Sequence, residues 1–339
     1  VGIGLISYSA YLWHQPLFAF ARLRSLTEPS HILMAVLAVA ALLLAWATWR
    51  WVEQPFRKRA NPVLVTRRSV FAASGAVGAV FVAFGLVGHF GKGFEWRGSG
   101  LANLDERVMV NHGLHTDCEG EFNNSTNCYT SPTPNVLLWG DSFAMHLAQG
   151  IIASEDNVPL QQHTMSVCSP VLGIAHVGEK YREDFAQRCI AFNEQVISWL
   201  RQQQSVDLVI LSSPFSQLLG DSVMLDNGEL MLDPSIRFVA DEIRNTAREI
   251  RKTGARVVVV SPTPSSGWDN GQCLMRSVYY GMNEASCNFA LDTDEERFEL
   301  LRSVADNVAV YWLHEDFCEN GTCDALKDNI FIYRDGGHL

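Results

Sequence analysis

A serine, an aspartate and a histidine of this sequence are of the types that form a nucleophilic catalytic triad. They lie near the two ends of the stretch from residue 136 to residue 339. The first, Ser142, ends the run VLLWGDS (136–142), in which an apolar segment stops at a small residue and an amphipathic segment follows. Such a turn places the serine at the tip of a strand and at a helix N-terminus, where free N–H groups can stabilise an oxyanion. The alternative is a turn in which Asp141 or Ser142 only caps the helix.

The other two residues, Asp335 and His338, stand three positions apart in RDGGHL (334–339), after the apolar run IFIY (330–333). At this spacing the carboxylate can orient the imidazole while the imidazole accepts the serine proton, which is the division of labour in a Ser-His-Asp triad. Taken alone, the pair also fits a solvated surface turn.

The segments that would position these residues alternate between short apolar runs and longer amphipathic ones. Strands are expected at Leu160–Thr164, Val136–Trp139, Leu208–Ser212, Arg256–Val260 and Val308–Leu313. Helices are expected at Phe143–Ser154, Ile190–Gln204, Pro234–Thr253 and Asp294–Asp306. Strands separated by helices predict an α/β domain with a parallel sheet covered on both faces. Its functional site should lie at the carboxyl ends of the strands.

The first ninety residues predict membrane helices. The strongest span, His31–Trp49, carries no charge apart from its histidine and is long enough to cross a hydrocarbon core. Val70–Phe90 is a second span, rich in the small residues that let membrane helices approach closely. Val1–Leu23 is a weaker third, interrupted by polar residues, and a buried helix of a soluble protein is the alternative for each.

Basic residues predict the orientation of these spans. Six of them lie between the spans His31–Trp49 and Val70–Phe90: Arg50, Arg57, Lys58, Arg59, Arg67 and Arg68. Short basic loops stay in the cytoplasm, so the chain after Phe90 should lie outside. A cleavable signal peptide is not expected, because the apolar runs are too long. The sequence begins inside an apolar run, so we expect it to be the C-terminal part of a longer protein.

Charge and cysteine content agree with an exported second half. The 339 residues carry a net charge of −11, and residues 1–90 hold 8 basic against 2 acidic residues, so the remainder holds 18 against 35. This acidic balance argues against nucleic acid as a partner. Eight cysteines follow Phe90, and an even number in an oxidising compartment predicts disulfides. Sequential pairing, one of many arrangements, would join Cys118–Cys128, Cys168–Cys189, Cys273–Cys287 and Cys318–Cys323. The spacing of cysteines and histidines does not favour a metal site.

These motifs resemble those of the SGNH hydrolase superfamily, whose first block is Gly-Asp-Ser and whose last is Asp-x-x-His. The subgroup fused to membrane acyltransferases is closer, since SVCSP (166–170) and Cys189 follow the serine. The resemblance covers residues 135–339 and implies a flavodoxin-like domain. It also implies that Ser142 is the nucleophile, His338 the general base and Asp335 its partner, with Asp141 in a secondary role.

The same resemblance implies an oxyanion hole built from the Ser142 N–H, with Gly173 as a second donor. A departure concerns the third donor, because the Gly-x-Asn-Asp block of the superfamily does not follow the Leu208–Ser212 strand. Either Ser213 or Gln217 supplies that donor, or the enzyme is slow.

The runs GLISYSAYLWHQPL (4–17) and WVEQPFR (51–57) resemble the closing helices of acyltransferase family 3, membrane proteins that acylate cell-surface glycans. The implied domains are the end of that membrane domain (1–60), a linker with an additional transmembrane helix (61–90), a periplasmic extension (91–134) and an SGNH-like catalytic domain truncated at its C-terminus (135–339). No cofactor is expected in this chain. Acetyl-CoA would be the donor in a membrane region preceding it.

The resemblances predict a multi-pass O-acyltransferase of the bacterial inner membrane, with acetyl as the favoured acyl group and the C-terminal domain in the periplasm. Its expected partners are a polysaccharide acceptor such as O-antigen, capsule or peptidoglycan, an acyl donor reached through the membrane domain, and the lipid bilayer. Two alternatives use the same residues differently. A membrane-tethered O-acetylesterase would replace the sugar hydroxyl with water, and a non-catalytic glycan-binding module would keep only the fold.

Overall fold

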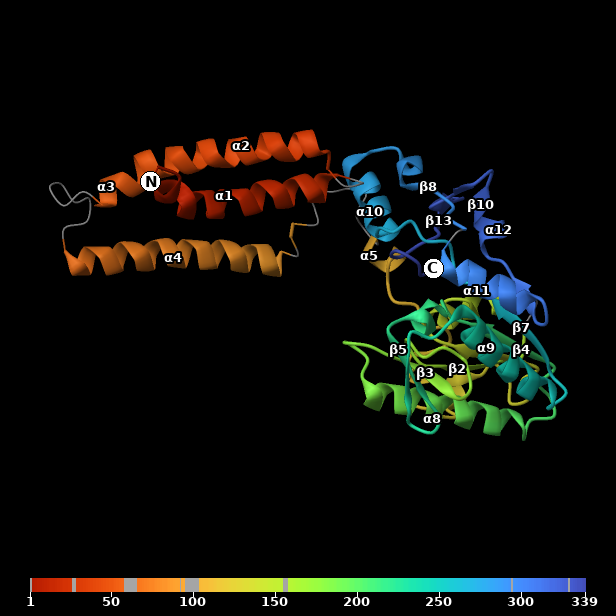
Figure 1. Ribbon diagram of the computed structural model, residues 1–339. Helices are drawn as coiled ribbons and strands as arrows, with labels where there is room; N and C mark the ends of the chain where they lie inside the picture. The colour runs from red at the N-terminus through yellow and green to blue at the C-terminus, as the bar shows by residue number, and fades with distance from the viewer. Residues whose placement is uncertain are drawn as a thin grey trace. The chain divides into compact units, whose positions relative to one another are not determined.

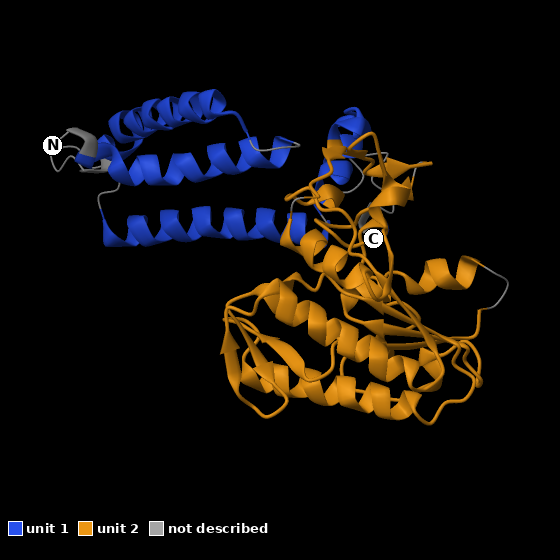
Figure 2. Ribbon diagram, turned by 45° about the vertical axis from the view of Figure 1, so that its right-hand side comes forward, with its two compact units in different colours: residues 1–106, 272–286 blue, residues 107–271, 287–339 orange. Residues whose placement is uncertain are grey.

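The computed structural model describes residues 2–25, 29–57, 66–91, 93–94, 104–154, 158–293, 295–328 and 330–339. The chain forms two compact units (Figure 2), residues 1–106 with 272–286 and residues 107–271 with 287–339. Lys58 and Arg59 of the basic stretch, and most of the glycine-rich stretch 91–100, lie outside the described residues.

Long helices make up the first unit. They are α1 (Gly2–Arg24), α2 (His31–Thr48), a π-helical turn η1 (Trp49–Glu53), α3 (Gln54–Arg57) and α4 (Arg67–Phe90). The first two lie side by side (Figure 1), and the Trp13 indole N–H donates to Thr48 Oγ1 at 2.8 Å. The Ser9 hydroxyl also donates to the Glu53 carboxylate, which follows α2.

Two stretches of the described chain are long and apolar enough to cross a membrane, His31–Glu53 and Arg67–Phe90. The segment Val1–Leu23 forms helix α1 but does not meet the same test, which agrees with its weaker pattern. The described residues of α4 include none that is buried, and Phe81 and Phe84 are 72% and 71% exposed. Apolar surroundings suit such a helix better than water does.

A five-stranded parallel sheet forms the centre of the second unit. Its order is β2 (Leu160–Thr164), β1 (Val136–Gly140), β4 (Leu208–Ser212), β7 (Arg256–Val260) and β9 (Ala309–Tyr311). In register, Gly140 lies between Thr164 and Ser212, so the neighbouring strands end together. The predicted α/β fold is confirmed, and the strand order is the flavodoxin-like one.

Helices cover both faces of this sheet (Figure 1). They are α6 (Ser142–Met145), α7 (Ala148–Ser154), α8 (Glu183–Leu200), α9 (Ile236–Arg251), α11 (Glu296–Ala305) and α12 (His314–Phe317), with α5 (Leu104–Arg107) and α10 (Asn270–Tyr280) at the boundaries of the unit. Alternate residues of each strand are buried on opposite faces of the sheet. Leu137 and Trp139 pack under α8 and α9, whereas Leu138 packs against α6 and α7.

Short antiparallel ladders were not predicted from the sequence. They comprise β3 (Ile174–Val177), β5 (Ser222–Leu225) and β6 (Leu230–Leu232) in one sheet, β8 (Phe289–Ala290), β10 (Cys318–Glu319) and β11 (Thr322–Cys323) in another, and β12 (Leu326–Lys327) with β13 (Ile330–Phe331) in a third. The predicted helix Phe143–Ser154 is also divided into α6 and α7. Helix α8 begins at Glu183, seven residues before its predicted start, with two acidic residues in its first turn.

Disulfides confirm the expected oxidation state of the second unit. Cys118–Cys128, Cys168–Cys189 and Cys318–Cys323 are paired as sequential pairing predicts. Cys273 and Cys287 are disulfide-bonded as well.

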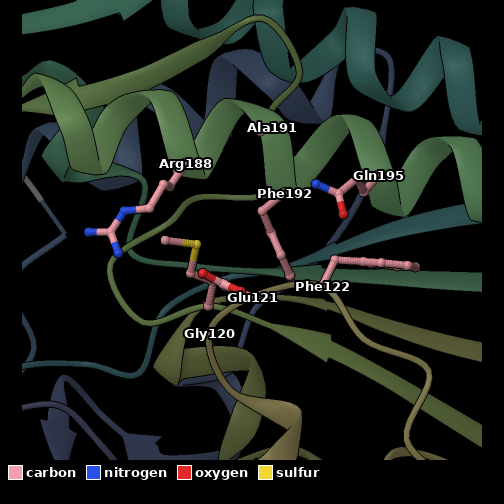
Figure 3. Close-up of a pocket in the computed structure, with 8 residues that line it drawn as sticks. Gly120, Glu121, Phe122, Arg188, Ala191, Phe192 and Gln195 are labelled. Carbon is pink, nitrogen blue, oxygen red and sulfur yellow. The ribbon is translucent and has the colours of Figure 1, made fainter.

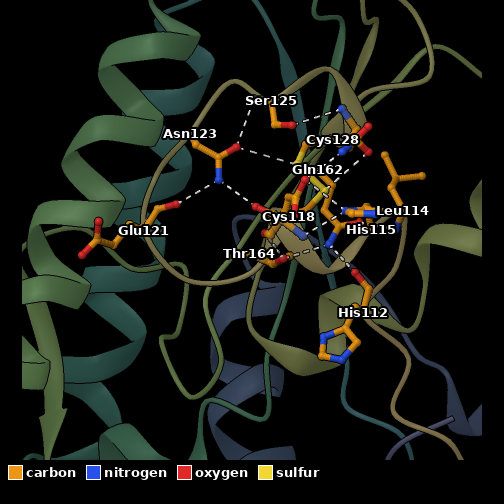
Figure 4. Close-up of a disulfide and its surroundings, with 12 residues drawn as sticks. His112, Leu114, His115, Cys118, Glu121, Asn123, Ser125, Cys128, Gln162 and Thr164 are labelled. Carbon is orange, nitrogen blue, oxygen red and sulfur yellow. Dashed lines mark hydrogen bonds and ion pairs between the residues drawn. A yellow bond between two sulfur atoms is a disulfide. The ribbon is translucent and has the colours of Figure 1, made fainter.

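The Cys118–Cys128 loop covers the outer edge of the sheet (Figure 4). Glu119 bridges to Thr164 and Tyr129 to Gln161, both on the edge strand β2. The Thr164 hydroxyl donates to the Cys118 carbonyl at 2.8 Å. An edge strand with unpaired backbone groups invites pairing with another chain, and this loop occupies that position.

Candidate active site

Ser142 follows the central strand β1, at the carboxyl end of the parallel sheet. Gly140 closes that strand, and a Cβ there would lie 2.0 Å from Ser212 O and 2.8 Å from the Ala144 Cβ. A glycine is therefore required for β1 to approach β4 this closely. Asp141 caps α6, its side chain accepting from Phe143 N at 2.9 Å, so Ser142 stands at the first position of the helix. Within the described chain, the Ser142 N–H has no acceptor.

The loop after β13 carries the other two candidate residues. His338 Nδ1 lies 2.9 Å from Asp335 Oδ2, and the backbone N–H groups of Gly337 and His338 both donate to Asp335 Oδ1 at 2.9 Å. Burial opposes ionisation of this carboxyl, but these hydrogen bonds outweigh it and hold the pKa of Asp335 well below its ordinary value. The Arg334 guanidinium, 3.2 Å away, adds a positive neighbour.

The structure brings the two ends of the domain together. Ser142 Oγ lies 2.8 Å from His338 Nε2, which gives the hydrogen-bonded order serine, histidine, aspartate. The Phe143 ring supports the imidazole at 4.5 Å between centroids. The Gly337 carbonyl accepts a hydrogen bond from the Thr263 hydroxyl, which attaches the loop to the segment after β7. A proton can pass from the serine to the imidazole in this geometry.

A buried polar network lies behind the serine. Asp141 Oδ2 accepts from Ser213 Oγ at 2.7 Å and from Gln217 Nε2 at 3.2 Å, while Gln217 Nε2 also contacts Ser169 Oγ at 2.9 Å. Burial raises the pKa of Asp141 to about 6, against the lowering effect of these hydrogen bonds. Ser213 and Gln217 were the sequence-based candidates for the third oxyanion donor. Both hydrogen-bond the buried Asp141 in this structure, and their role as oxyanion donors stays a prediction.

A helix residue that sequence reasoning missed supports this network. Asn193, fully buried on α8, accepts from the Trp139 indole N–H at 2.9 Å and donates to the carbonyls of Ser169 and Val171. It thus ties β1 to the loop that holds Ser169, beside the Cys168–Cys189 disulfide. In the sequence, the sign of this role is that Asn193 stands on the apolar face of an amphipathic helix, where a buried amide needs hydrogen-bond partners.

The loop between β2 and β3 contains both a strained residue and the predicted second oxyanion donor. Val167 has a φ of 65°, which is rare for a β-branched residue, and strain of this kind clusters at functional sites. Gly173 lies at the turn just before β3, with a φ of 78°. A Cβ there would meet nothing within 4 Å, so backbone conformation rather than crowding explains the glycine. Its role as a donor stays a prediction.

His146 is a second histidine beside the candidate triad, and sequence reasoning assigned it no role. Its ring lies 6.1 Å from the His338 ring, and its Nδ1 accepts from Leu339 N at 3.3 Å. Burial lowers the pKa of His146 to about 3, so it is neutral at physiological pH. A neutral neighbour does not oppose the positive charge that His338 acquires when it takes a proton.

The described residues contain no group of three histidine, cysteine or acidic side chains that could hold a metal ion. Serine, histidine and aspartate at the carboxyl end of a flavodoxin-like sheet define an α/β protein with a hydrogen-bonded Ser-His-Asp arrangement.

Comparison with known families agrees with this class. The chain belongs to the family described as "SGNH domain (fused to AT3 domains)", whose family model matches residues 115–339. It is also similar to a solved "lipopolysaccharide acetyltransferase periplasmic domain" of Salmonella ser. Paratyphi A. That likeness has 15% identity and a TM-score of 0.47, and it covers 71% of this chain and 90% of that chain. No curated protein matches the sequence.

Proposed function

We propose that this chain is the exported end of a membrane O-acetyltransferase that acetylates a bacterial cell-surface polysaccharide through an acyl-enzyme on Ser142. The observation that carries the proposal is the hydrogen-bonded series Ser142, His338 and Asp335, with contacts of 2.8 Å and 2.9 Å. Membership in the family of SGNH domains fused to AT3 domains supports an enzyme of the acyltransferase or esterase type.

The first half-reaction forms the acyl-enzyme. His338 Nε2 takes the Ser142 proton as Oγ attacks the donor carbonyl, and the tetrahedral oxygen is stabilised by the Ser142 N–H at the start of α6. The ionised Asp335 stabilises the imidazolium that forms. The imidazolium then returns its proton to the leaving group, and an acetyl ester on Ser142 remains.

The second half-reaction transfers the acetyl group to the acceptor. A sugar hydroxyl approaches the ester carbonyl, His338 removes its proton, and the new oxyanion collapses to release Ser142. The imidazolium protonates Ser142 Oγ, which restores the starting state. Water in place of the sugar would give an O-acetylesterase by the same steps.

The proposed location is the bacterial inner membrane, with several spans and the second unit in the periplasm. The two apolar helices and the disulfides of the second unit support it. The donor acetyl group would come from acetyl-CoA through a membrane region preceding this chain.

The test uses the full chain in detergent with p-nitrophenyl acetate. Ser142→Ala and His338→Ala should each lower turnover by at least about 10³-fold, and wild type should carry an acetyl adduct that Ser142→Ala lacks. Ser216→Ala, which changes an exposed serine, is the matched control and should behave as wild type. Turnover that survives in Ser142→Ala would refute the proposal. Acetylated polysaccharide as a product would distinguish transfer from hydrolysis.

A further inference from the structure

A hollow of about 270 Å³ lies between the Cys118–Cys128 loop and α8 (Figure 3). The loop contributes residues 120–122, and the helix contributes Arg188, Ala191, Phe192 and Gln195. Met165, directly after β2, completes the lining. None of these residues belongs to the candidate triad, and the functions considered so far do not use them.

The floor of the hollow is apolar and rigid. Phe192 and Met165 are 3% and 8% exposed, so each shows only an edge to the hollow. The Phe122 ring packs on the His163 ring at 4.7 Å between centroids and 30° between planes. Burial lowers the pKa of His163 to about 3, so this support is neutral at physiological pH.

The rim of the hollow is polar and available for hydrogen bonds. In the part of the chain that the structure describes, neither the Gln195 amide nor the Glu121 carboxylate has a partner. The Arg188 guanidinium pairs with Asp184 on its own helix at 3.7 Å, and both side chains are more than half exposed. Arginine and amide donors therefore stand beside carboxylate and amide acceptors at one opening.

We propose that this hollow binds one sugar ring of the acceptor glycan, which rests on the proposed function. The half-buried Phe122 ring can pack against the C–H face of a pyranose, and the polar rim can hydrogen-bond its hydroxyls. Met165 N donates to Gly140 O at 3.0 Å, and Gly140 lies two residues before Ser142. Because β1 and β2 are parallel neighbours, Met165 of the lining and Ser142 both lie at the carboxyl end of the sheet. A glycan chain can occupy the hollow with one ring and present another ring to the serine.

The test fills the hollow without touching the candidate triad. Ala191, an exposed residue of its lining, is replaced by tryptophan in the full chain in detergent, and Ala305→Trp on α11 is the matched exposed control. The probe is the surface polysaccharide of the source bacterium, O-deacylated with mild base, and its dissociation constant is measured by titration. We expect binding to weaken by at least about tenfold in Ala191→Trp and to stay unchanged in Ala305→Trp. A smaller loss, of about threefold, is expected for Gln195→Ala.

Two results would overturn the inference. The first is a wild type that does not bind the polysaccharide, and the second is an Ala191→Trp variant that binds it as tightly as wild type does. Turnover of p-nitrophenyl acetate tests the proposed function separately, because that small ester does not need the hollow. Ala191→Trp should keep this turnover, which also shows that the variant is folded. A failure of the Ser142→Ala test would therefore be distinguishable from a failure of the sugar site.

Discussion

At the residue scale, the two carboxyl groups of the site are held in opposite ways. Asp335 accepts from two backbone N–H groups and from His338, and these bonds lower its pKa. Asp141 also accepts several hydrogen bonds, but it is 1% exposed and burial raises its pKa to about 6. Asp335 is therefore suited to hold a permanent charge beside the imidazole, whereas Asp141 is suited to fix the turn that presents Ser142.

The raised pKa of Asp141 predicts a pH effect on stability. Its value of about 6 in the folded protein exceeds the ordinary 3.8, so the folded state binds a proton first as the pH falls. The contribution of Asp141 to the free energy of unfolding therefore rises between pH 7 and pH 4. Relative to Asp141→Asn, which cannot titrate, wild type should gain up to about 3 kcal/mol over this range, measured by urea unfolding at each pH.

Asp335→Asn is the control for this prediction. The pH effect of Asp335 on the free energy of unfolding has the opposite sign to that of Asp141 and falls below about pH 4. The folded pKa of Asp335 is lowered, so its stabilising contribution is present above about pH 4 and is lost as the pH falls below that value. Parallel stability profiles for wild type and Asp141→Asn between pH 7 and pH 4 would show that Asp141 is not perturbed by burial.

Val167 supplies a second residue-scale prediction. At a φ of 65° a branched side chain costs about 1–2 kcal/mol, while glycine loses about 0.5–1 kcal/mol through the entropy of the unfolded chain. Val167→Gly should thus leave the free energy of unfolding unchanged or raise it by up to about 1 kcal/mol. Val177→Gly, at a half-buried valine without a positive φ, should lower it. Equal losses in the two variants, measured by urea unfolding, would argue against strain at Val167.

At the element scale, the site depends on how closely β1 and β4 approach. A Cβ at Gly140 would lie 2.0 Å from the Ser212 carbonyl, a backbone atom that cannot swing away. The register places Gly140 opposite Ser212, one residue before the buried Ser213 of the polar network. Any separation of these strands therefore moves Asp141, Ser142 and their hydrogen-bond partners together.

Gly140→Ala should consequently disrupt the second unit. We expect the free energy of unfolding to fall by about 3 kcal/mol or more, or the folded protein to be lost, as judged by urea unfolding and soluble yield. Gly150→Ala is the control, because a Cβ on that residue of α7 would meet nothing within 4 Å. It should raise stability by up to about 1 kcal/mol. If both variants were equally stable, the close approach of β1 and β4 would be wrong.

The elements that could be predicted from the sequence are those with strong periodicity. Three strands of the parallel sheet, Leu160–Thr164, Leu208–Ser212 and Arg256–Val260, have the predicted bounds. For the two central ones, Leu208–Ser212 and Arg256–Val260, the reason is that apolar runs of this length are typical of buried parallel strands. The β5–β6 hairpin was missed although its turn contains Asn227-Gly228, a strong hairpin signal, because its strands are only three and four residues long.

The residues of the candidate triad could be named from the sequence because each lies in a short motif, whereas their supports could not. Gln217, which contacts both Asp141 and Ser169, comes from a different segment than either of them, and Asn193 comes from a helix interior. Only tertiary packing brings these side chains together, so their spacing along the sequence does not predict the contacts. The same reason explains why the break between α6 and α7 was missed. It coincides with His146, whose ring receives the N–H of Leu339, 193 residues away.

At the scale of the whole molecule, one segment links the two halves of the sequence. Residues 272–286 follow the apolar helices in sequence yet belong to the first unit. Arg276 donates to the Ser25 carbonyl at 2.9 Å, in the connection between α1 and α2. Under the proposed function, α2 and α4 each cross a membrane, which places the connection between α1 and α2 on the same side as the chain after α4. The hydrogen bond between Arg276 and Ser25 is compatible with that arrangement.

This agreement predicts the topology of the full chain in the membrane. An epitope tag inserted in the basic stretch after Lys58 should resist trypsin added to intact spheroplasts, whereas residues 107–339 should be digested. Inverted membrane vesicles should show the reverse pattern, because the positive charges hold the tagged loop in the cytoplasm. The control is a tag placed after Arg24, which should be cut from the same side as the second unit. Cleavage of the two tags from the same side would contradict the proposed crossing by α2, since two segments joined by one membrane crossing cannot share a compartment.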